Sequence, residues 1–509
     1  MQNDPIICEI RCPVHGFIGL TDFERRIVDS PQFQRLRRVK QLAWTDYVYP
    51  GATHSRFEHS LGVMHLATRL FDAIVETSEP LLRRVYRYND NGFARARQIV
   101  RLAALLHDVG HPPFSHAMEK LLPLKAAGHY SLFPGQDAEP QLYEHEDYSV
   151  AIIEGPLAEI IHGHASNRRN FRIEPSEVSA LIQGTPAGPT LFWREIISGQ
   201  LDADRMDYLL RDSLHAGVSY GKYDLNRIVS SICAIERPSE ESEEPKVAVM
   251  KGGAYAVEAL IVARYWMHKQ VYFHKTRLAC DHHLGNAMRE ILKTETGIEA
   301  FPPPGTPEQL QSFLEWDDFR VMGLLARGNG GEHGERLMTR NHYRLVCEIE
   351  HLDTSLSELN RSTRRAEEIV KALRTKVKDI ERPKALWYKT KANDELILVD
   401  DENRRQIGYL SSFSVLMKSI NAGSQVFVYA DKADAGAAKV DYEKFLREEA
   451  EKTRAAEKVK IDAAPNLGSA SQELADGAVP STQLAFPPQG TGKMVQREVP
   501  TYKGVPNVG

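Results

Sequence analysis

The sequence Leu-Leu-His-Asp-Val-Gly-His-Pro-Pro-Phe-Ser-His at residues 105–116 decides the fold and the chemistry that we expect of this chain. It closes a helix predicted over 94–106, in which Ile99, Leu102 and Leu106 recur at helical spacing. A glycine and two prolines soon after the His-Asp pair end this helix. The pair is therefore predicted at the edge of a buried core.

His107 and Asp108 are side chains that can bind a metal. An ionised aspartate buried without a partner costs several kcal/mol, on the order of 3–5, so Asp108 needs a cation or good donors. A single histidine at a helix end is ordinarily explained by the helix dipole. Two more histidines, His111 and His116, follow within nine residues, and this density favours a metal or catalytic site.

Two distant segments offer the remaining ligands. His59 lies near the start of a long helix predicted from Arg56, whose guanidinium is one turn away and suited to an anion. Asp204 and Asp207 lie one turn apart in another predicted helix. Taken singly, these are an ordinary helix-start histidine and surface ion pairs. Together with the His-Asp pair they give two imidazoles and two carboxylates, a set that suits a divalent transition metal.

The rest of the chain is predicted to be mainly α-helical. Residues 1–300 form a helical core with an N-terminal strand or hairpin, and 301–383 a helical extension. Residues 384–462 are expected to form a small α/β lobe and a charged helix, and the Pro-, Gly- and Ser-rich 463–509 a disordered tail. Helical spacing within the core covers 21–42, 146–154, 176–183, 190–215 and 253–293.

Composition excludes several classes of protein. Of the 509 residues, 42% are hydrophobic and 26% charged, as in an ordinary globular protein. No apolar run approaches a membrane span, and five scattered cysteines fit a reducing compartment, so a cytoplasmic location is expected. The net charge of −5 provides no general attraction to nucleic acid or to an anionic membrane.

The order His59, His107–Asp108, Asp204 resembles the HD superfamily of metal-dependent phosphohydrolases. The match is densest at 13–61, with Pro-Val-His-Gly, Asp-Ser-Pro-Gln-Phe-Gln-Arg-Leu-Arg and Tyr-Val-Tyr-Pro-Gly-Ala-Thr-His-Ser-Arg-Phe-Glu-His. There the chain is similar to the deoxynucleoside triphosphate triphosphohydrolases. The resemblance implies an HD-domain helical core that cleaves a dNTP into deoxynucleoside and triphosphate, through water attack on the α-phosphorus.

The resemblance also implies a role for each matching residue. Metal ligands would be His59, His107, Asp108 and Asp204. Catalytic residues would be His111, His116, His145 and Glu119, with His116 protonating the leaving 5′ oxygen. Phosphate and sugar contacts would be Arg56, Gln41, Leu42, Arg205, Tyr208, Asp212, Arg264, His268, Tyr272 and Lys275, with Gln41 and Asp212 at the 3′ hydroxyl and Leu42 and Tyr272 crowding the 2′ position. An activator site would use Asp29, Gln34 and Arg37.

Two positions depart from the family pattern. Cys8 stands where the activator site has a lysine, which puts nucleotide activation in doubt. Phe273 stands where a glutamine lies near the substrate base, so the base preference is open.

The expected cofactors are a divalent transition metal (Fe, Mn, Zn or Ni) and Mg²⁺ arriving with a nucleoside triphosphate. By resemblance the chain would form a homo-oligomer, a dimer or a tetramer. Two other functions stay open: hydrolysis of another nucleotide, such as a ribonucleotide, a monophosphate or a dinucleoside polyphosphate, and nucleotide sensing or nucleic-acid binding without turnover. Complete metal ligands and net acidity weigh against the last.

Overall fold

The computed structural model describes residues 4–125, 141–184, 192–236, 245–351, 395–402, 405–419 and 423–462, with short pieces between 364 and 385. The chain divides into two units, Met1–Glu449 and Ala450–Gly509. Of the second unit the structure describes only the end of helix α19 (Ala435–Asp462). The predicted disordered tail at 463–509 lies outside the described residues.

The chain begins with the predicted hairpin. Strands β1 (Cys8–Cys12) and β2 (Gly16–Leu20) pair antiparallel, and Cys12 lies opposite Gly16. Gly16 has a φ of +78°, which glycine adopts without steric cost.

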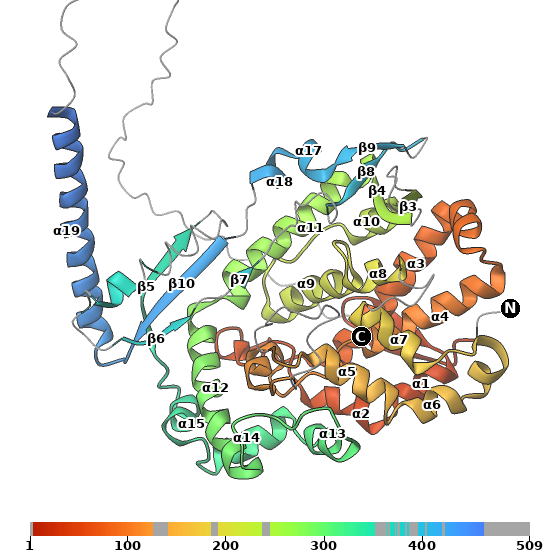
Figure 1. The fold of residues 1–509 in the computed structure, drawn as a ribbon, viewed down its shortest axis with the longest axis horizontal. Helices are drawn as coiled ribbons and strands as arrows, with labels where there is room; N and C mark the ends of the chain where they lie inside the picture. Colours follow the sequence, from red (N-terminus) through yellow and green to blue (C-terminus); the bar gives the residue numbers. More distant parts are fainter. Residues whose placement is uncertain are drawn as a thin grey trace, which may run out of the picture. The chain divides into compact units, whose positions relative to one another are not determined.

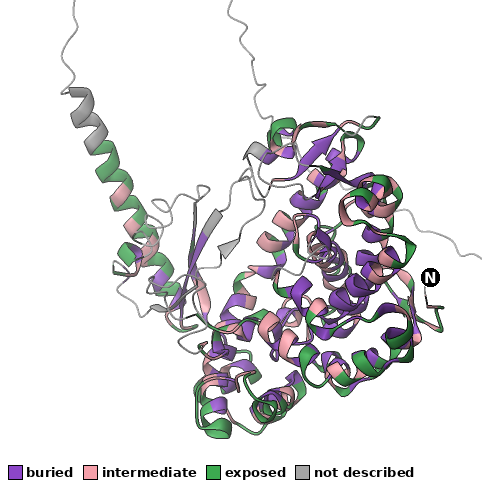
Figure 2. Ribbon diagram, turned by 45° about the vertical axis from the view of Figure 1, so that its right-hand side comes forward, coloured by how far each residue is buried: buried purple, intermediate pink, exposed green. Residues whose placement is uncertain are grey.

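Three helices form the centre of the large unit (Figure 1). Helix α3 (Arg56–Tyr86) packs against both α4 (Asp90–Leu106) and α9 (Ala203–Ala216). Each begins at a capping residue that satisfies a free backbone N–H; for example, the Asp202 side chain accepts from the N–H of Arg205 at 2.7 Å. Buried residues concentrate within this bundle, and exposed residues lie on the outer helices (Figure 2). The predicted mainly α fold is confirmed.

Further helices surround these three. They are α5 (His145–Glu154), α6 (Ala158–Gly163), α7 (Pro175–Gln183), α8 (Arg194–Ser198), α10 (Leu225–Ser231), α13 (Pro307–Leu314), α14 (Asp318–Ala326) and α15 (Gly331–Met338), with short helical turns η2 (Thr45–Tyr47), η3 (Ser115–Leu121), η4 (Asn167–Phe171) and η6 (Lys251–Gly253). Buried residues of α13, α14 and α15 belong to the same hydrophobic core as α3 and α4.

The helix predicted at 21–42 is broken into three pieces. These are α1 (Asp22–Val28), α2 (Pro31–Gln34) and η1 (Arg35–Arg38). The break occurs because the Ser30 side chain accepts from the N–H of Phe33 and starts a new helix with proline at its first position.

The helix predicted at 253–293 is also interrupted. Helix α11 (Ala254–Met267) continues into a π-helical turn η7 (His268–Tyr272), and α12 (Lys275–Thr296) then starts anew. The His274 side chain accepts from the N–H of Thr276 and caps α12. Such π turns are frequent at functional sites.

Two small sheets complete the described part. One has the order β3 (Ile232–Glu236), β4 (Pro245–Met250), β8 (Ile397–Val399) and β9 (Gln406–Tyr409), with β4 and β8 parallel. In the other, β10 (Gly423–Ala430) pairs antiparallel with β5 (Arg344–His351), β6 (Val377–Glu381) and β7 (Lys384–Ala385). The segment predicted as a lobe, 384–462, thus gives strands to two different sheets. Within the predicted helical extension at 301–383, β5 and β6 are strands.

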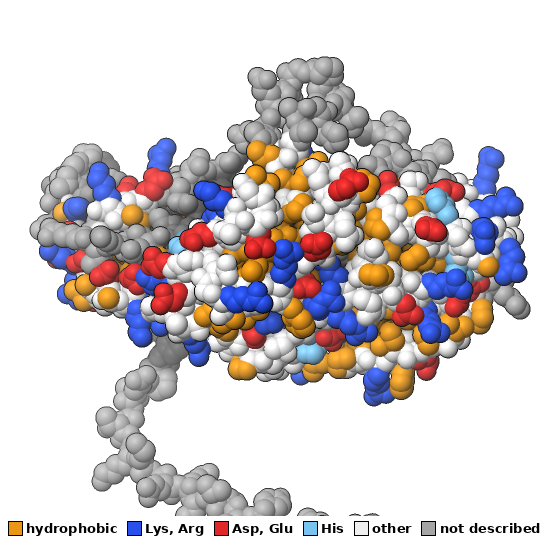
Figure 3. Space-filling view, turned by 90° about the horizontal axis from the view of Figure 1, so that it is seen from below, with side chains coloured by type: hydrophobic (Ala, Val, Ile, Leu, Met, Phe, Trp, Pro, Cys, Tyr) orange, Lys and Arg blue, Asp and Glu red, His pale blue; other side chains and the backbone are white. Residues whose placement is uncertain are grey.

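The face seen from below in Figure 3 has no dominant charge, because basic and acidic side chains are interspersed over it. Among the described residues, no helix combines the length and apolar character needed to cross a bilayer.

A buried ion pair anchors helix α4 to the N-terminal segment. The Glu24 carboxylate is fully buried, accepts from Arg101 Nη2 at 2.6 Å and caps the Thr21 N–H at 2.9 Å. We predict that Arg101→Met lowers the free energy of unfolding by about 3–5 kcal/mol, because it leaves the Glu24 charge without its cation. Chemical denaturation measures this loss.

Arg97→Met is the matched control, since Arg97 lies one turn earlier on α4 and pairs with the exposed Asp72. It should cost less than about 1 kcal/mol. Equal losses in the two variants would contradict the assigned role of the buried pair.

Candidate functional site

Three helix ends bring the predicted metal ligands together. His59 comes from the first turn of α3, His107 and Asp108 follow the end of α4, and Asp204 lies in the first turn of α9. His59 Nε2 lies 3.0 Å from Asp204 Oδ1 and 3.5 Å from Asp108 Oδ2. His107 Nε2 lies 3.3 Å from Asp108 Oδ1 and 3.8 Å from Asp204 Oδ1. Four ligating groups distant in the sequence therefore face one small space.

The hydrogen bonds of the two histidines fix their tautomers. His59 Nδ1 donates to Asp207 Oδ2 at 2.8 Å, and His107 Nδ1 donates to the carbonyl of Ala104 at 2.8 Å. Each ring therefore directs its Nε2 at carboxylate oxygens. His107 Nε2 is buried with no hydrogen-bond partner among the described residues. This donor set fits a divalent cation, which would satisfy both lone pairs and both carboxylates.

The pKa shifts of His59 and Asp108 also show that positive charge is favoured at this centre. Burial opposes a charge on His59, yet its hydrogen bonds to Asp204 and Asp207 raise its pKa to about 10. Burial alone would raise the pKa of Asp108, but Arg56 and His107 hold it well below its ordinary value. A cation at the centre would replace the proton on His59.

A second layer of residues orients His59. Asp207 also accepts from Arg211 Nε and Nη2, at 2.7 and 2.9 Å, and lies 2.6 Å from His15 Nε2. Such outer carboxylates fix the orientation of a ligating histidine and raise its basicity. No role was predicted for Asp207 or His15. Helical spacing placed Asp207 one turn from Asp204, and His15 belongs to the Pro-Val-His-Gly motif, but neither residue was linked to His59.

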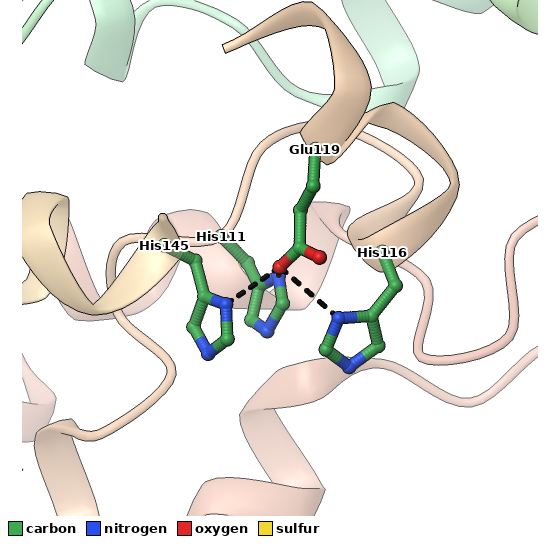
Figure 4. A group of neighbouring side chains, drawn as sticks. All are labelled: His111, His116, Glu119 and His145. Carbon is green, nitrogen blue, oxygen red and sulfur yellow. Dashed lines mark hydrogen bonds and ion pairs between the residues drawn. The ribbon is translucent and has the colours of Figure 1, made fainter. Parts of the chain in front are cut away.

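The predicted catalytic histidines surround one carboxylate (Figure 4). Glu119 Oε1 lies 2.6 Å from His145 Nδ1, 3.0 Å from His116 Nδ1 and 3.8 Å from His111 Nδ1. The rings of His111 and His145 stack with centroids 3.8 Å apart, and His111 Nε2 lies 3.2 Å from Asp108 Oδ1. This cluster therefore adjoins the candidate metal centre.

Charge differs among these four residues. Burial, Arg56 and His145 lower the pKa of His111 well below its ordinary value, so His111 is neutral. Burial opposes a charge on His145, but its hydrogen bond to Glu119 raises the pKa to about 9. Because Glu119 already pairs with His145 and His116, this second group of potential ligands has less need of a metal than the first.

Helix α14 holds the loop that carries His111 and His116. The Asp318 side chain accepts from the N–H of Phe114 at 2.7 Å and from the N–H of Lys40 at 2.9 Å. Phe114 has a φ of +56°, a conformation rare for a non-glycine residue. Arg35 bridges the same elements, since it donates to the carbonyls of His111 and Trp316.

A cavity of about 400 Å³ opens beside this cluster. Seven of the predicted contacts and the predicted catalytic His116 line it; the contacts are Gln41, Leu42, Arg56, Tyr208, Asp212, His268 and Tyr272. Arg205, Arg264 and Lys275 are not among its lining residues. Arg277, Lys120 and Asp281 line it without having been predicted, because they lie outside the recognised motifs.

Asp212 and Tyr272 form one wall of the cavity. The Tyr272 hydroxyl donates to Asp212 Oδ2 at 2.7 Å, and Asp212 Oδ1 lies 2.7 Å from His54 Nε2. His54 is buried and stacks on His215, and its role was not predicted. These contacts fix the carboxylate that is predicted to bind a sugar hydroxyl.

The residues predicted to contact phosphate differ in how freely their side chains could reach a substrate. The Arg56 guanidinium is buried, pairs with Asp108 and donates to Ser115 Oγ at 2.7 Å. Arg205 pairs with Asp202 at 2.9 Å, so it must exchange this partner to reach a phosphate. Lys275 is exposed at the start of α12.

The predicted activator residues lie at the corner between α1 and η1. Gln34 Nε2 donates to the carbonyl of Val28, and Arg37 Nε donates to Gln34 Oε1 at 2.8 Å. The Arg37 guanidinium lies over the Phe57 ring. Asp29 caps the end of α1, and Cys8 lies in β1. Nucleotide binding at this corner stays a prediction.

Comparison with known proteins matches two regions of the chain. A family model described as HD domain matches residues 56–212, and one described as HD associated region matches residues 224–455. A crystal structure of a hypothetical protein from Aquifex aeolicus has a TM-score of 0.64 and 29% identity, and covers 85% of this chain and 99% of that one.

Curated relatives include proteins with and without a stated activity. An uncharacterised protein of Methanocaldococcus jannaschii is 36% identical over 345 residues, which are 68% of this chain and 60% of that protein. The deoxynucleoside triphosphate triphosphohydrolase SAMHD1 of Homo sapiens is 30% identical over 329 residues, 60% of this chain and 47% of that protein. The SAMHD1 homolog of Dictyostelium discoideum is 31% identical over 283 residues, 54% and 48% respectively. The chain thus matches about half to three fifths of the length of these relatives.

We predict that Asp204→Ala lowers the affinity for a divalent transition metal by at least about tenfold, because it removes a ligand from the centre. The fold should persist, since the Asp204 side chain is partly exposed. Metal titration and elemental analysis measure the affinity, and circular dichroism checks the fold. Asp72→Ala, at an exposed aspartate, should leave metal binding unchanged. Full metal content in Asp204→Ala would remove Asp204 from the ligand set.

We predict that Asp207→Asn weakens metal affinity by about 10–100-fold, although Asp207 touches no metal, because it releases the His59 ring. Glu58→Gln is the matched control, since Glu58 also pairs with Arg211 but does not contact His59. If both variants weakened the metal equally, the effect would belong to Arg211 rather than to the orientation of His59.

Proposed function

We propose that this chain, which matches the HD-domain model and is similar to the SAMHD1 enzymes, is a phosphohydrolase whose substrate is a deoxynucleoside triphosphate, cleaved into deoxynucleoside and triphosphate. One observation carries the proposal: the cavity that joins the predicted sugar contacts to Arg56 and His116 opens beside the four convergent metal ligands. His59, His107, Asp108 and Asp204 would hold the ion. When bound, the ion would lower the pKa of a bound water and polarise a phosphoryl oxygen.

The chain's own residues support attack at the α-phosphorus. Water oxygen forms the new bond to phosphorus, and the bond from phosphorus to the 5′ oxygen breaks. His116 is the group we assign to donate a proton to that leaving oxygen, since its Nδ1 lies 3.0 Å from Glu119 and its Nε2 points away from that partner (Figure 4). His116 is half exposed and lines the cavity, so it can reach a substrate. Arg56 would offset negative charge on the phosphate.

The cavity wall that contains Asp212 and Tyr272 supports a preference for deoxyribose. Leu42 and Tyr272, which the resemblance assigns to the 2′ position, both line the cavity, and the hydrogen bond from Tyr272 to Asp212 fixes the tyrosine ring. A rigid wall without space for a hydroxyl rejects a ribonucleotide sterically. Gln41 and Asp212 remain to bind the 3′ hydroxyl.

Product analysis tests the reaction. The purified full-length chain, loaded in turn with Mn²⁺, Fe²⁺ or Mg²⁺, is incubated with each dNTP and NTP in water enriched in oxygen-18. We expect deoxynucleoside without label and triphosphate with one labelled oxygen, since the bond from phosphorus to the 5′ oxygen breaks. Pyrophosphate with a nucleoside monophosphate, or labelled nucleoside, would contradict the proposal.

His116→Ala tests the assigned proton donor. We expect kcat to fall about 10²–10⁴-fold with metal content unchanged, the range found for loss of a general acid. His162→Ala is the matched control, because His162 is also exposed and paired with a glutamate, Glu174, but lies outside the site. Near-normal turnover in His116→Ala would assign the proton transfer to another group.

A further inference from the structure

Part of the cavity wall is not accounted for by the predicted phosphate and sugar contacts. The unassigned polar lining residues there are Lys120 from η3 and Arg277 and Asp281 from α12, and Phe114 and Leu278 supply apolar surface. The two arginines predicted for the phosphates, Arg205 and Arg264, are not lining residues. The predicted contacts are assigned to the phosphates and the sugar of a nucleoside triphosphate. The base is therefore the group that this wall would contact.

Asp281 has a free acceptor in this wall. The residue is only 8% exposed, and its Oδ2 lies 3.0 Å from Arg277 Nε. Its Oδ1 is buried without a hydrogen-bond partner among the described residues. Burial raises the pKa of Asp281, and Arg277 and Lys120 counteract that rise. A buried acceptor left unsatisfied costs about 1–3 kcal/mol, which a ligand N–H would recover.

Lys120 lies beside Asp281 because Gly285 gives it room. A Cβ placed at Gly285 would come within 2.6 Å of Lys120 Cε and 2.9 Å of Nζ. Gly285 follows Asp281 by one helical turn, so the ammonium lies over the same face of α12. The wall therefore presents an acceptor and a cationic donor next to each other.

Guanine matches this pair better than the other bases do. Its N1–H and 2-amino group are neighbouring donors that a carboxylate can accept together, and its O6 lies beside them as an acceptor for an ammonium. Adenine and cytosine present a single amino donor on that edge, and thymine a single N–H between two carbonyls. Phe114 and Leu278 provide the apolar contact that the faces of a base need.

We propose that Asp281 and Lys120 form a base-recognition subsite that selects guanine, so that dGTP is the preferred substrate. This inference rests on the proposed function, because it takes the cavity as a nucleotide site. Asp281 accepts from N1–H and the 2-amino group, and Lys120 donates to O6.

The test compares substrates that differ by one group. In the wild-type protein kcat/KM for dGTP should exceed that for dITP, which lacks the 2-amino group, by about tenfold or more. Asp281→Ala should bring this ratio close to one, mainly by lowering kcat/KM for dGTP. Equal rates for dGTP and dITP in the wild type, or a ratio unchanged in Asp281→Ala, would overturn the proposal.

Gly285→Ala provides a second variant that keeps every charge. The added methyl group displaces the flexible end of Lys120 and leaves Asp281 in place. It should reduce, without abolishing, the preference for dGTP over the 2-aminopurine analogue, which lacks both O6 and the N1 hydrogen, and leave the dGTP to dITP ratio unchanged. If Gly285→Ala kept the full wild-type preference for dGTP over the 2-aminopurine analogue, Lys120 would not belong to the subsite.

Binding separates failure of this inference from failure of the proposed reaction. Calorimetry with the Asp204→Ala variant and Mg²⁺ measures nucleotide affinity without turnover. Tighter binding of dGTP than dITP would support the subsite even if no dNTP were hydrolysed, whereas equal binding would refute it. Hydrolysis of all dNTPs at equal rates would refute the subsite and leave the proposed reaction standing.

Discussion

Two imidazole nitrogens and two carboxylates that face one another in a largely buried space repel unless a proton or a metal cation lies between them. The arrangement of His59, His107, Asp108 and Asp204 creates this constraint, and much of the surrounding structure serves to maintain it. Helix α4 delivers the His-Asp pair to its end, and α3 and α9 pack against each other so that their first turns meet there. The energetic cost of gathering these groups is met by packing elsewhere in the helical core.

The charged residues around the candidate metal centre are paired with residues of opposite charge. Asp207 and Arg211 form a buried pair behind His59, and Arg56 neutralises part of Asp108 from the other side. Glu119 balances His145, so the neighbouring histidine cluster is electrically satisfied without an ion. The site is thus divided into a part that demands a cation and a part that can exchange protons. A metal-assisted hydrolysis of a phosphate ester would use both.

Much of this site could be predicted from the sequence because its residues follow local rules. The His-Asp pair ends an apolar helix and His59 lies near the start of another, so hydrophobic spacing placed these residues correctly. Asp204 was expected inside one helix over 190–215, but it lies in the first turn of α9. Asp281 and Lys120 could not be found in this way, since no spacing distinguishes a charged helix face lining a cavity from one facing water. His15 illustrates the same limit, because its contact with Asp207 depends on how a hairpin packs 192 residues away. The break at His274 was missed because a side-chain cap overrode the apolar periodicity.

The loop between α4 and η3 is held by groups that lie far beyond the HD domain. Asp318 and the carbonyl of Trp316 belong to the region after residue 224, yet they fix Phe114 in its left-handed conformation and, through Arg35, the backbone of His111. The region matched by the HD-associated model therefore helps to build the candidate site. A shortened protein ending near residue 212 would lose these contacts together with the buried residues that α13, α14 and α15 add to the core, so the candidate site and the helical core depend on the same later part of the chain.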